Sequence, residues 1–344
     1  MENVLISGIG GVGGVNFSAA LACTKQYRIF GTDYFKLHQI FPEATKVFSS
    51  PKHTDPQFIP TLRKIIKEQK ISFLHCFPTS EALQVRLLGV PCKTLLPTYQ
   101  AMTLAFDKYE STILLTKAGI KTPKLYKYEE KDYSFPVWIR ARRGAGGARS
   151  LCCYDQEDIN AWLHIWSHYG ENTPEDYVIQ EYVKGSDIAW DSLWFNGKLL
   201  ASFARERVEY HSRGLGKGGS PTAARIIHDE SVNSIGVSAV KALDEKPHGF
   251  YCIDLLRKES EVYVTEVNIG KAHTTLPLWG LAMQKRFGNL MFNLAYLYTE
   301  LGLGHFVSAV SMFDIYPEDY FLVRDVDCGS WLYNEKDGKI RIDK

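Results

Sequence analysis

Apolar runs and helically spaced segments alternate along the first hundred residues of the chain. The apolar runs at residues 3–8, 27–33 and 71–78 are short and nearly continuous, which is typical of strands buried in a parallel sheet. Residues 55–70 repeat apolar positions at helical spacing, with an acidic start and a basic end that suit the helix dipole. This alternation predicts a small doubly wound α/β domain over residues 1–98.

The pattern changes after residue 100. Residues 101–123 predict one helix that ends at a glycine and a proline turn. Three later segments, residues 135–154, 187–210 and 249–268, each have the pattern of a strand, a turn and a second strand. Strands that pair with their own hairpin partners form an antiparallel sheet, so this part of the chain is predicted to be α+β.

Composition narrows the classes of function without choosing one. The chain has 344 residues, of which 45% are hydrophobic and 23% charged, and its formal net charge is +1. Such a balance gives no electrostatic reason to expect nucleic acid or an anionic membrane as a partner. The start of the chain lacks the basic region of a secretory signal, and a cytoplasmic location is expected. The seven cysteines form no CxxC pair, so they are expected to be free thiols rather than metal ligands or disulfides.

A glycine run closes the first strand. The segment "GIGGVGG" has the spacing Gly8-x-Gly10-x-x-Gly13, and Asp33 follows about twenty positions later. This is the spacing of a dinucleotide-binding fingerprint, in which the acidic residue binds a ribose. An NAD-dependent oxidoreductase is therefore one hypothesis. It accounts for residues 1–35 and leaves the rest of the chain without a role.

A second glycine-rich segment, "RARRGAGGARS", lies between two predicted antiparallel strands. It lacks the Gly-Lys-Ser/Thr ending of a P-loop and is not followed directly by a helix. A glycine turn can still fold over a polyphosphate and offer it backbone N–H groups. Four arginines flank this turn, namely Arg140, Arg142, Arg143 and Arg149. Guanidinium groups suit anionic oxygen, whereas a solvated hairpin tip is the alternative interpretation.

Acidic and amide side chains meet at the end of the last predicted hairpin. Glu266 and Asn268 lie two apart on one strand and so face the same side, and a turn near "KES" would bring Asp254 opposite them. Two carboxylates and an amide oxygen are the hard ligands that magnesium prefers. Their neighbours are apolar, which favours a metal site over plain surface charge.

The order of these motifs resembles that of the ATP-grasp superfamily, in particular the carbamoyl-phosphate-synthase-like carboxylate–amine ligases. The resemblance covers roughly residues 1–290 and implies an ATP-grasp fold, α/β plus α+β, with a Rossmann-like pre-ATP-grasp domain over residues 1–98. The ATP-grasp domain itself would span residues 99–304, with a mobile lid over about residues 122–183. Residues 305–344 would form a C-terminal hairpin extension.

The resemblance also implies a nucleotide site. Lys108 and Arg140 would contact the phosphates, the lid loop would cover them, and the strand "YVIQEYVKGSD" would hold the adenine and the ribose. The implied ATP-binding residues are Lys108, Arg140, Gly146, Gly147, Arg149, Glu181, Tyr182, Val183 and Asp187. The implied ligands of Mg²⁺, or of Mn²⁺ in its place, are Asp254, Glu266 and Asn268.

The sequence departs from the family where many relatives follow the magnesium-binding Asn with Pro-Arg. This chain reads "EVNIGKAHTT", so the arginine that would orient an acyl phosphate is missing. The candidates to replace it are Lys271, His273, Arg205, Arg207 and Arg225. Of these, Arg207, Arg225 and Lys271 join Arg140 as the expected catalytic residues. The glycine-rich segment 213–221 resembles a variable loop near the phosphates, with Lys217 and Ser220 as candidates, although simple loop composition explains it equally well.

These motifs together predict an ATP-dependent carboxylate–amine ligase that acts through an acyl phosphate and releases ADP and phosphate. Its partners would be a small-molecule carboxylate and an amine, with no nucleic acid and no membrane, and a homodimer is the commonest assembly. The opening glycines would then border the acceptor side of the cleft, and Asp33 would have no ribose to bind. A non-catalytic nucleotide-binding protein on the same scaffold is the alternative that the missing Pro-Arg leaves open.

Overall fold

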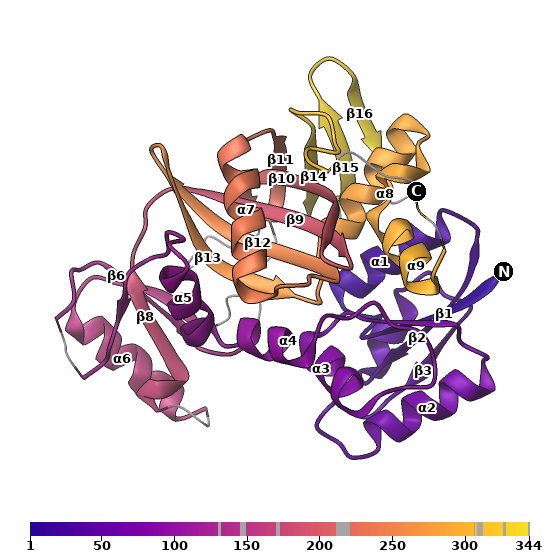
Figure 1. Ribbon diagram of the computed structural model, residues 1–344, viewed down its shortest axis with the longest axis horizontal. Coiled ribbons are helices and arrows are strands. Elements are labelled where there is room, and N and C mark those ends of the chain that lie inside the picture. The colour runs from indigo at the N-terminus through magenta and orange to yellow at the C-terminus, as the bar shows by residue number, and fades with distance from the viewer. Residues whose placement is uncertain are drawn as a thin grey trace.

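The computed structural model describes residues 1–129, 132–144, 149–169, 173–210, 221–305, 307, 312–325 and 328–342. Three sheets organise this part of the chain, and helices cover their faces (Figure 1). Within the described residues, no helix is both long enough and apolar enough to cross a membrane.

The N-terminal sheet is parallel, as the sequence predicts, and it has four strands: the three predicted ones and β3, which the apolar pattern did not reveal. Its strand order is β3–β2–β1–β4, and its members are β1 (Glu2–Ser7), β2 (Tyr27–Asp33), β3 (Lys46–Ser49) and β4 (Phe73–Cys76). The helices that cover it are α1 (Val12–Ala22), α2 (Phe58–Glu68) and α3 (Thr79–Leu88). Phe17 of α1 and Leu62 of α2 belong to different core clusters, which places these helices on opposite faces of the sheet and makes it doubly wound.

The glycine run after β1 is needed for close packing. A Cβ on Gly13 would lie 1.8 Å from the ring of Phe77, and one on Gly14 would lie 2.5 Å from the carbonyl oxygen of Gly8. Asp33 is only 5% exposed, and its two carboxylate oxygens accept hydrogen bonds of 2.9 Å from the backbone N–H groups of Gly10 and Phe35. The carboxylate therefore serves the loop itself rather than a bound ribose.

A smaller antiparallel sheet lies within residues 122–183, where the lid is predicted, and this unit is called the lid below. Its strand order is β5–β8–β6–β7, and its members are β5 (Leu125–Tyr126), β6 (Val137–Ala141), β7 (Ser150–Cys153) and β8 (Tyr177–Glu181). Helix α6 (Gln156–Ser167) packs Ile159 against one face of it, and the short 3₁₀ helix η2 (Pro174–Asp176) leads into β8. The lid thus has a hydrophobic core of its own and lies at one end of the molecule (Figure 1).

The largest sheet is antiparallel and has the order β13–β12–β9–β10–β11–β14–β15–β16. Its strands are β9 (Ser186–Phe195), β10 (Lys198–Tyr210), β11 (Pro221–Ile227), β12 (Gly249–Lys258), β13 (Glu261–Ile269), β14 (Phe321–Asp325), β15 (Gly329–Asn334) and β16 (Gly338–Arg341). The predicted hairpins β9–β10 and β12–β13 are confirmed. The C-terminal strands β14–β16 continue the same sheet beyond β11.

Helices cover both faces of the large sheet. Helix α7 (Glu230–Leu243) packs on one face through Val232 and Val240, together with Trp190 of β9. On the other face lie α8 (Leu276–Phe287), the 3₁₀ helix η3 (Leu290–Phe292) and α9 (Leu294–Leu303), which share a core with α1. Because α1 belongs to the N-terminal domain, this shared core joins that domain to the large sheet.

The predicted single helix over residues 101–123 is wrong. Two helices, α4 (Tyr99–Phe106) and α5 (Lys108–Lys117), occupy this segment and meet at Asp107. The Asp107 side chain accepts hydrogen bonds from the backbone N–H groups of Tyr109 and Glu110, so it caps α5 and starts a new helix. The break places Lys108 in the first turn of α5, and this helix lies beside the lid (Figure 1).

Candidate functional site

The predicted metal ligands lie together at the edge of the large sheet. Asp254 of β12 pairs directly with Glu266 of β13, the pairing expected from a hairpin that turns near residue 259. Asn268 projects from the same face as Glu266 because the two are two residues apart. Its amide Nδ2 donates a 3.3 Å hydrogen bond to Oδ2 of Asp254. The local hairpin register is therefore sufficient to bring these three oxygen-bearing side chains together.

Two cations approach Glu266 from different parts of the chain. Lys108 Nζ, at the start of α5, lies 3.6 Å from one Glu266 carboxylate oxygen, and Arg140 Nη1 of lid strand β6 lies 3.6 Å from the other. Lys108 also donates to the carbonyl oxygen of Gly144 at 2.9 Å, and Arg140 donates to that of Thr265 at 2.5 Å. Burial lowers the pKa of both cations, against the opposing influence of Glu266. Two partly desolvated cations share one carboxylate, which leaves positive charge available for an anion.

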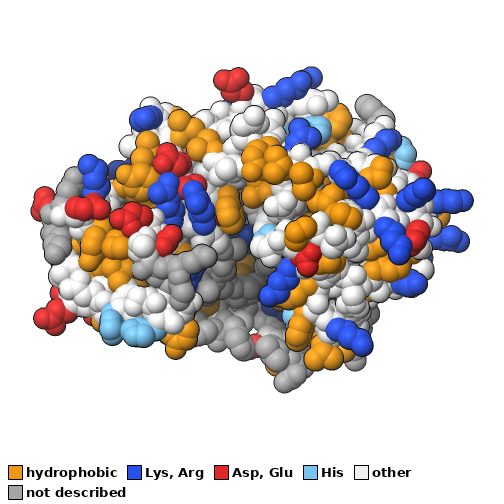
Figure 2. Space-filling view, turned by 90° about the horizontal axis from the view of Figure 1, so that it is seen from below, with side chains coloured by type: hydrophobic (Ala, Val, Ile, Leu, Met, Phe, Trp, Pro, Cys, Tyr) orange, Lys and Arg blue, Asp and Glu red, His pale blue; other side chains and the backbone are white. Residues whose placement is uncertain are grey.

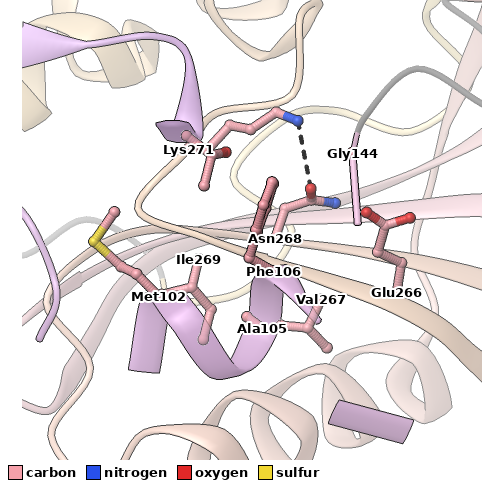
Figure 3. Close-up of a pocket in the computed structure, with 10 residues that line it drawn as sticks. Met102, Ala105, Phe106, Gly144, Glu266, Val267, Asn268, Ile269 and Lys271 are labelled. Atoms are coloured by element: carbon pink, nitrogen blue, oxygen red, sulfur yellow. Dashed lines mark hydrogen bonds between the residues drawn. The ribbon is translucent and has the colours of Figure 1, made fainter. Parts of the chain in front are cut away.

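A pocket opens beside this cluster. It is lined by Thr79, Met102, Ala105, Phe106, Gly144, Glu266, Val267, Asn268, Ile269 and Lys271. Lys271 extends over Asn268, with its Nζ 3.5 Å from Oδ1 of that amide, while Glu266 faces Gly144 (Figure 3). The pocket thus combines residues from α3, α4, the start of the lid loop and β13. From below, the molecular surface is hollowed between the half that carries the lid and the half that carries the N-terminal sheet (Figure 2).

Asp254 is the centre of a charged network. Arg207 contacts Asp254 through Nη2, and its Nη1 lies 2.8 Å from Oδ1 of Asp187, which also accepts a hydrogen bond from the Tyr210 hydroxyl. His273 Nε2 lies 3.4 Å from Oδ1 of Asp254. Burial would raise the pKa of the Asp254 carboxyl, but Arg207 and His273 outweigh burial and hold that pKa well below its ordinary value. Asp254 is therefore an ionised carboxylate at neutral pH.

A buried ion pair lies behind this network. Asp191 of β9 is fully buried and contacts the guanidinium of Arg205, which is 1% exposed. The other side of Asp191 contacts His273, whose Nδ1 lies 2.8 Å from Oδ1. Burial lowers the pKa of His273 to about 4, although Asp254 opposes this effect. Sequence reasoning did not select Asp191. The sequence feature that could have revealed Asp191 is its position as a lone carboxylate in the apolar run "IAWDSLW". A charge buried in a core requires a partner.

The arginines next to the lid loop have a different role from Arg140. Arg142 Nε lies 2.7 and 2.9 Å from the two carboxylate oxygens of Asp107, and Arg143 Nη2 lies 2.9 Å from one of them. Burial would raise the pKa of Asp107, but hydrogen bonds from Arg142, Glu110 and Arg143 outweigh it and lower that pKa. Both arginines are thus held by a carboxylate, and they fasten the lid strand β6 to the start of α5.

The structure does not bring every predicted residue to this cluster. Arg225 of β11 lies opposite Glu206 of β10, and its Nη2 is 2.9 Å from Oε2 of that residue. Glu206 directly precedes Arg207 in β10. Adjacent residues of a strand point to opposite faces, so Arg225 lies on the face opposite Arg207 and Asp254. Arg149 lies over the ring of Trp166 within the lid, at 5.9 Å from its centre. Gly146 and Gly147, together with Lys217 and Ser220, lie outside the described residues.

The predicted adenine-binding residues lie where β8 leaves the lid. The backbone N–H of Glu181 donates to the carbonyl oxygen of Lys124, and the backbone N–H of Lys124 donates to the Glu181 carboxylate. Tyr182 packs against Trp138, with 6.2 Å between the ring centres. Val183 is buried. The chain then enters β9, and Asp187 at the start of this strand forms an ion pair with Arg207. These four residues therefore follow one another from the lid to the charged network.

The oxygen donors fit a hard divalent cation. Asp254 is ionised, it contacts the amide of Asn268, and the directly opposite Glu266 presents its carboxylate on the same face. Carboxylate and amide oxygens in this arrangement suit magnesium or manganese. The nearby cations Lys108, Arg140 and Lys271 would repel a bare metal ion but would attract the phosphate oxygens that commonly complete such a site.

Comparison with known proteins agrees with the fold. Residues 105–269 match a family model described as an ATP-grasp domain. The fold is similar to that of L-amino acid ligase from Bacillus licheniformis, with a TM-score of 0.69 and 14% identity over 94% of this chain and 80% of that one. It is also similar to N5-carboxyaminoimidazole synthetase from Staphylococcus aureus, a structure that contains ADP, with a TM-score of 0.69 and 14% identity over 94% and 82% of the two chains.

A sequence match extends over a shorter region. Over 133 residues the chain is 27% identical to a protein named 5-formaminoimidazole-4-carboxamide-1-(beta)-D-ribofuranosyl 5'-monophosphate synthetase from Pyrobaculum neutrophilum. This match covers 37% of the chain and 34% of that protein. The chain spans less than two thirds of the length of the curated relatives it matches. The family model and the shared fold agree: residues 105–269 match an ATP-grasp domain, and the chain has the ATP-grasp fold.

Proposed function

We propose that the chain is an ATP-dependent ligase that joins a small-molecule carboxylate to an amine. The observation that carries this proposal is the meeting of Lys108 and Arg140 at Glu266, each at 3.6 Å, beside a pocket that also contains Asn268 and Lys271. Cations from the lid and from the body would grip the phosphates between them. The relatives named as ligases and synthetases support the same class of reaction.

In this proposal the nucleotide lies between the lid and the large sheet. Lys108 and Arg140 bind its phosphates under the loop that begins at Gly144. Glu181, Tyr182 and Val183 line the adenine, and Asp187 binds the ribose hydroxyls. The ADP bound in the similar synthetase from Staphylococcus aureus supports a nucleotide of this kind. Arg207 would then share Asp187 with the ribose, since it already contacts that carboxylate.

The metal ligands in this proposal are Asp254, Glu266 and Asn268. Mg²⁺ held by these oxygens would neutralise charge on the phosphates and orient the γ-phosphoryl group for transfer. The protein's own contribution is to keep Asp254 ionised, chiefly through Arg207, and to hold Asn268 through its hydrogen bond to Asp254.

The proposed reaction has two steps. A carboxylate oxygen of the substrate attacks the γ-phosphorus, the bond to ADP breaks, and an acyl phosphate forms. The amine nitrogen then attacks the acyl carbon, phosphate leaves, and the nitrogen loses a proton. Positioning and charge neutralisation supply most of the catalysis of the first step. Closure of the lid would protect the acyl phosphate from water.

Lys271 is the proposed substitute for the missing arginine. It is the candidate cation that lines the pocket, and its Nζ lies 3.5 Å from the proposed metal ligand Asn268. Arg207 is committed to Asp187 and Asp254 and would act from the far side of the metal site, whereas Arg225 lies on the opposite face of the sheet. Lys271 can therefore neutralise charge that develops on the acyl phosphate.

The product of ATP consumption tests the proposal. The purified chain is incubated with ATP, Mg²⁺ and panels of carboxylate and amine pairs, and ADP, AMP, phosphate and pyrophosphate are measured. ADP and phosphate released only with both substrates are expected, with a hydroxamate formed when hydroxylamine replaces the amine. AMP and pyrophosphate would exclude the acyl-phosphate route. ATP binding without turnover across the panels would favour a non-catalytic nucleotide-binding protein.

A further inference from the structure

Outside the three proposed metal ligands, His273 also points a ring nitrogen at the Asp254 carboxylate. His273 follows β13 by four residues, in the segment where the family's Pro-Arg is missing. Its Nε2 lies 3.4 Å from Oδ1 of Asp254 and has no hydrogen-bond partner, although the atom is buried. A buried ring nitrogen without a partner is costly unless a ligand occupies its open side.

The other ring nitrogen is fixed. Nδ1 lies 2.8 Å from Oδ1 of Asp191, and Nη2 of Arg205 lies 3.4 Å from the same ring nitrogen. The carboxylate contact is the shorter of the two, which favours the proton on Nδ1. The lone pair of Nε2 is then directed toward Asp254. A histidine that donates one N–H to a carboxylate and offers the other nitrogen to a cation has the arrangement of metal-ligating histidines. In this chain the carboxylate in question is that of Asp191, which is fully buried.

The ring is also held in place by its surroundings. The backbone N–H of His273 donates to Sγ of the buried Cys252 at 3.3 Å, and Asn16 of α1 donates to the carbonyl oxygen of Thr274 at 2.7 Å. The segment after β13 is therefore anchored both to the sheet and to the N-terminal domain. Such anchoring keeps Nε2 aimed at Asp254 rather than at solvent.

A metal ion bound on the Asp191 side of the His273 ring is disfavoured. Asp191, Cys252 and His273 have ligand atoms within 4.8 Å of one another, which by itself is compatible with a metal ion. The guanidinium of Arg205 already neutralises Asp191, however, and a metal there would face that positive charge. Arg207 also contacts Oδ1 of Asp254, but its second partner Asp187 gives it an alternative carboxylate.

From this geometry we propose that His273 is a nitrogen ligand of the metal held by Asp254 and Asn268, with Asp191 as the residue that orients it. The inference rests on the metal site of the proposed function. A nitrogen donor among oxygen donors favours Mn²⁺ over Mg²⁺, because imidazole binds transition metals better than it binds magnesium. The site would therefore prefer manganese.

Electron spin-echo spectroscopy of bound Mn²⁺ tests the ligand directly. The full chain is loaded with Mn²⁺ and a non-hydrolysable ATP analogue, and a ¹⁴N coupling from imidazole is expected. His273→Asn keeps an amide donor near Asp191 but removes the ligand atom, so the coupling should vanish while Mn²⁺ still binds. His273→Gln places an amide group near the position of Nε2, and it should also remove the coupling. Cys252→Ser is the matched control and should leave the coupling unchanged.

Metal affinities give a second measure. Mn²⁺ should bind the native chain more tightly than Mg²⁺, and His273→Asn should reduce this preference by about tenfold, as should Asp191→Asn. Mn²⁺ binding without a ¹⁴N coupling, or a coupling that survives His273→Asn, would overturn the inference and leave the proposed function standing. Loss of Mn²⁺ binding in Cys252→Ser would place the metal on the Asp191 side and overturn it too. Failure of the native chain to bind Mn²⁺ and nucleotide at all would remove both proposals.

Discussion

At the scale of single residues, charge pairing separates the candidate arginines. Arg140 contacts Glu266 and the backbone of Thr265, Arg207 contacts Asp187 and Asp254, and Arg225 contacts Glu206 on the other face of the sheet. All three are arginines on strands with carboxylate partners, yet only the first two can reach a ligand at Asp254 or Glu266. The face of the sheet to which each arginine points decides whether it can reach the site.

Arg140→Ala and Glu266→Gln should each reduce ADP release by about 100-fold or more, because each removes charge that positions the phosphates or the metal. Steady-state ADP release with a productive substrate pair is the measurement. Arg225→Ala is the matched control, with an expected change of less than about twofold, the range of a surface ion pair. Near-native rates in both test variants would contradict the site.

Glu81 gives the stability of the fold a dependence on pH. This carboxyl lies in the first turn of α3 and is 7% exposed. Burial, with a smaller contribution from Asp33, raises its pKa from 4.5 to about 7, although Ser7 opposes the shift. The pKa of Glu81 is higher in the folded chain, about 7, than in the unfolded chain, 4.5. Its contribution to the free energy of unfolding is therefore fully present below pH 4.5 and is lost as the pH rises through about 7.

The free energy of unfolding should therefore fall over this pH range by up to about 3 kcal/mol on account of Glu81. Glu81→Gln should flatten this dependence and stabilise the chain at pH 8 relative to the native protein. Urea unfolding at pH 5 and pH 8 measures the effect. Glu68→Gln, at an exposed position of α2, is the control and should keep the native slope. Equal slopes in the native chain and in Glu81→Gln would contradict this assignment.

At the scale of elements, the break between α4 and α5 couples the lid to the body. Asp107 ends α4, caps α5 and accepts hydrogen bonds from Arg142 and Arg143 at the end of β6. In the same place, the backbone N–H of Lys108 donates to the carbonyl oxygen of Arg142, and its side-chain Nζ donates to that of Gly144. One carboxylate thus sets both the helix start and the position of the lid strand.

Asp107→Asn should weaken ATP binding while the cap of α5 is kept. The amide can still cap α5 but cannot pair with two guanidinium groups, so the KM for ATP should rise roughly tenfold, equivalent to about 1.4 kcal/mol. Asp155→Asn, at the N-cap of α6, makes the same chemical change without an arginine partner and should leave the KM unchanged. KM values and melting temperatures of both variants are compared. The same KM in both would contradict a role for Asp107 in holding the lid.

At the scale of the whole molecule, the nucleotide would connect two bodies that have separate cores. The lid has its own hydrophobic cluster, and the large sheet shares its core with the N-terminal domain. The contacts that join the lid to the body near the pocket are polar, through Arg140, Arg142 and Arg143. A ligand bound between them would add contacts to both.

A non-hydrolysable ATP analogue with Mg²⁺ should therefore stabilise the chain by about 2.7 kcal/mol at a hundred times its Kd. Differential scanning calorimetry should show this as a rise in Tm of a few degrees. NADH is the control ligand and should cause no rise, because Asp33 is engaged by Gly10 and Phe35. A shift with NADH and none with the ATP analogue would restore the dinucleotide hypothesis. Sedimentation of the same samples tests the predicted homodimer.

Local pattern was sufficient for much of the fold and for part of the site. The parallel N-terminal sheet, the two long hairpins and the meeting of Asp254 with Glu266 and Asn268 follow from short-range periodicity and one turn. The break at Asp107 could not be predicted from local pattern. The apolar spacing of residues 101–117 is continuous, and the two arginines that hold Asp107 lie 35 and 36 residues away.

The sequence by itself determined the match of residues 105–269 to an ATP-grasp domain, the alternation of the first domain and the face shared by Glu266 and Asn268, because these depend on residues close in the chain. The tertiary structure alone decided which cations reach that face. Lys108 and Arg140 meet Glu266 across more than 120 residues, Arg225 is turned away by its strand register, and His273 finds Asp191 and Asp254 on two other strands. Contacts of this kind depend on how sheets and loops pack, since a buried charge is stable only where a partner from elsewhere in the chain lies beside it.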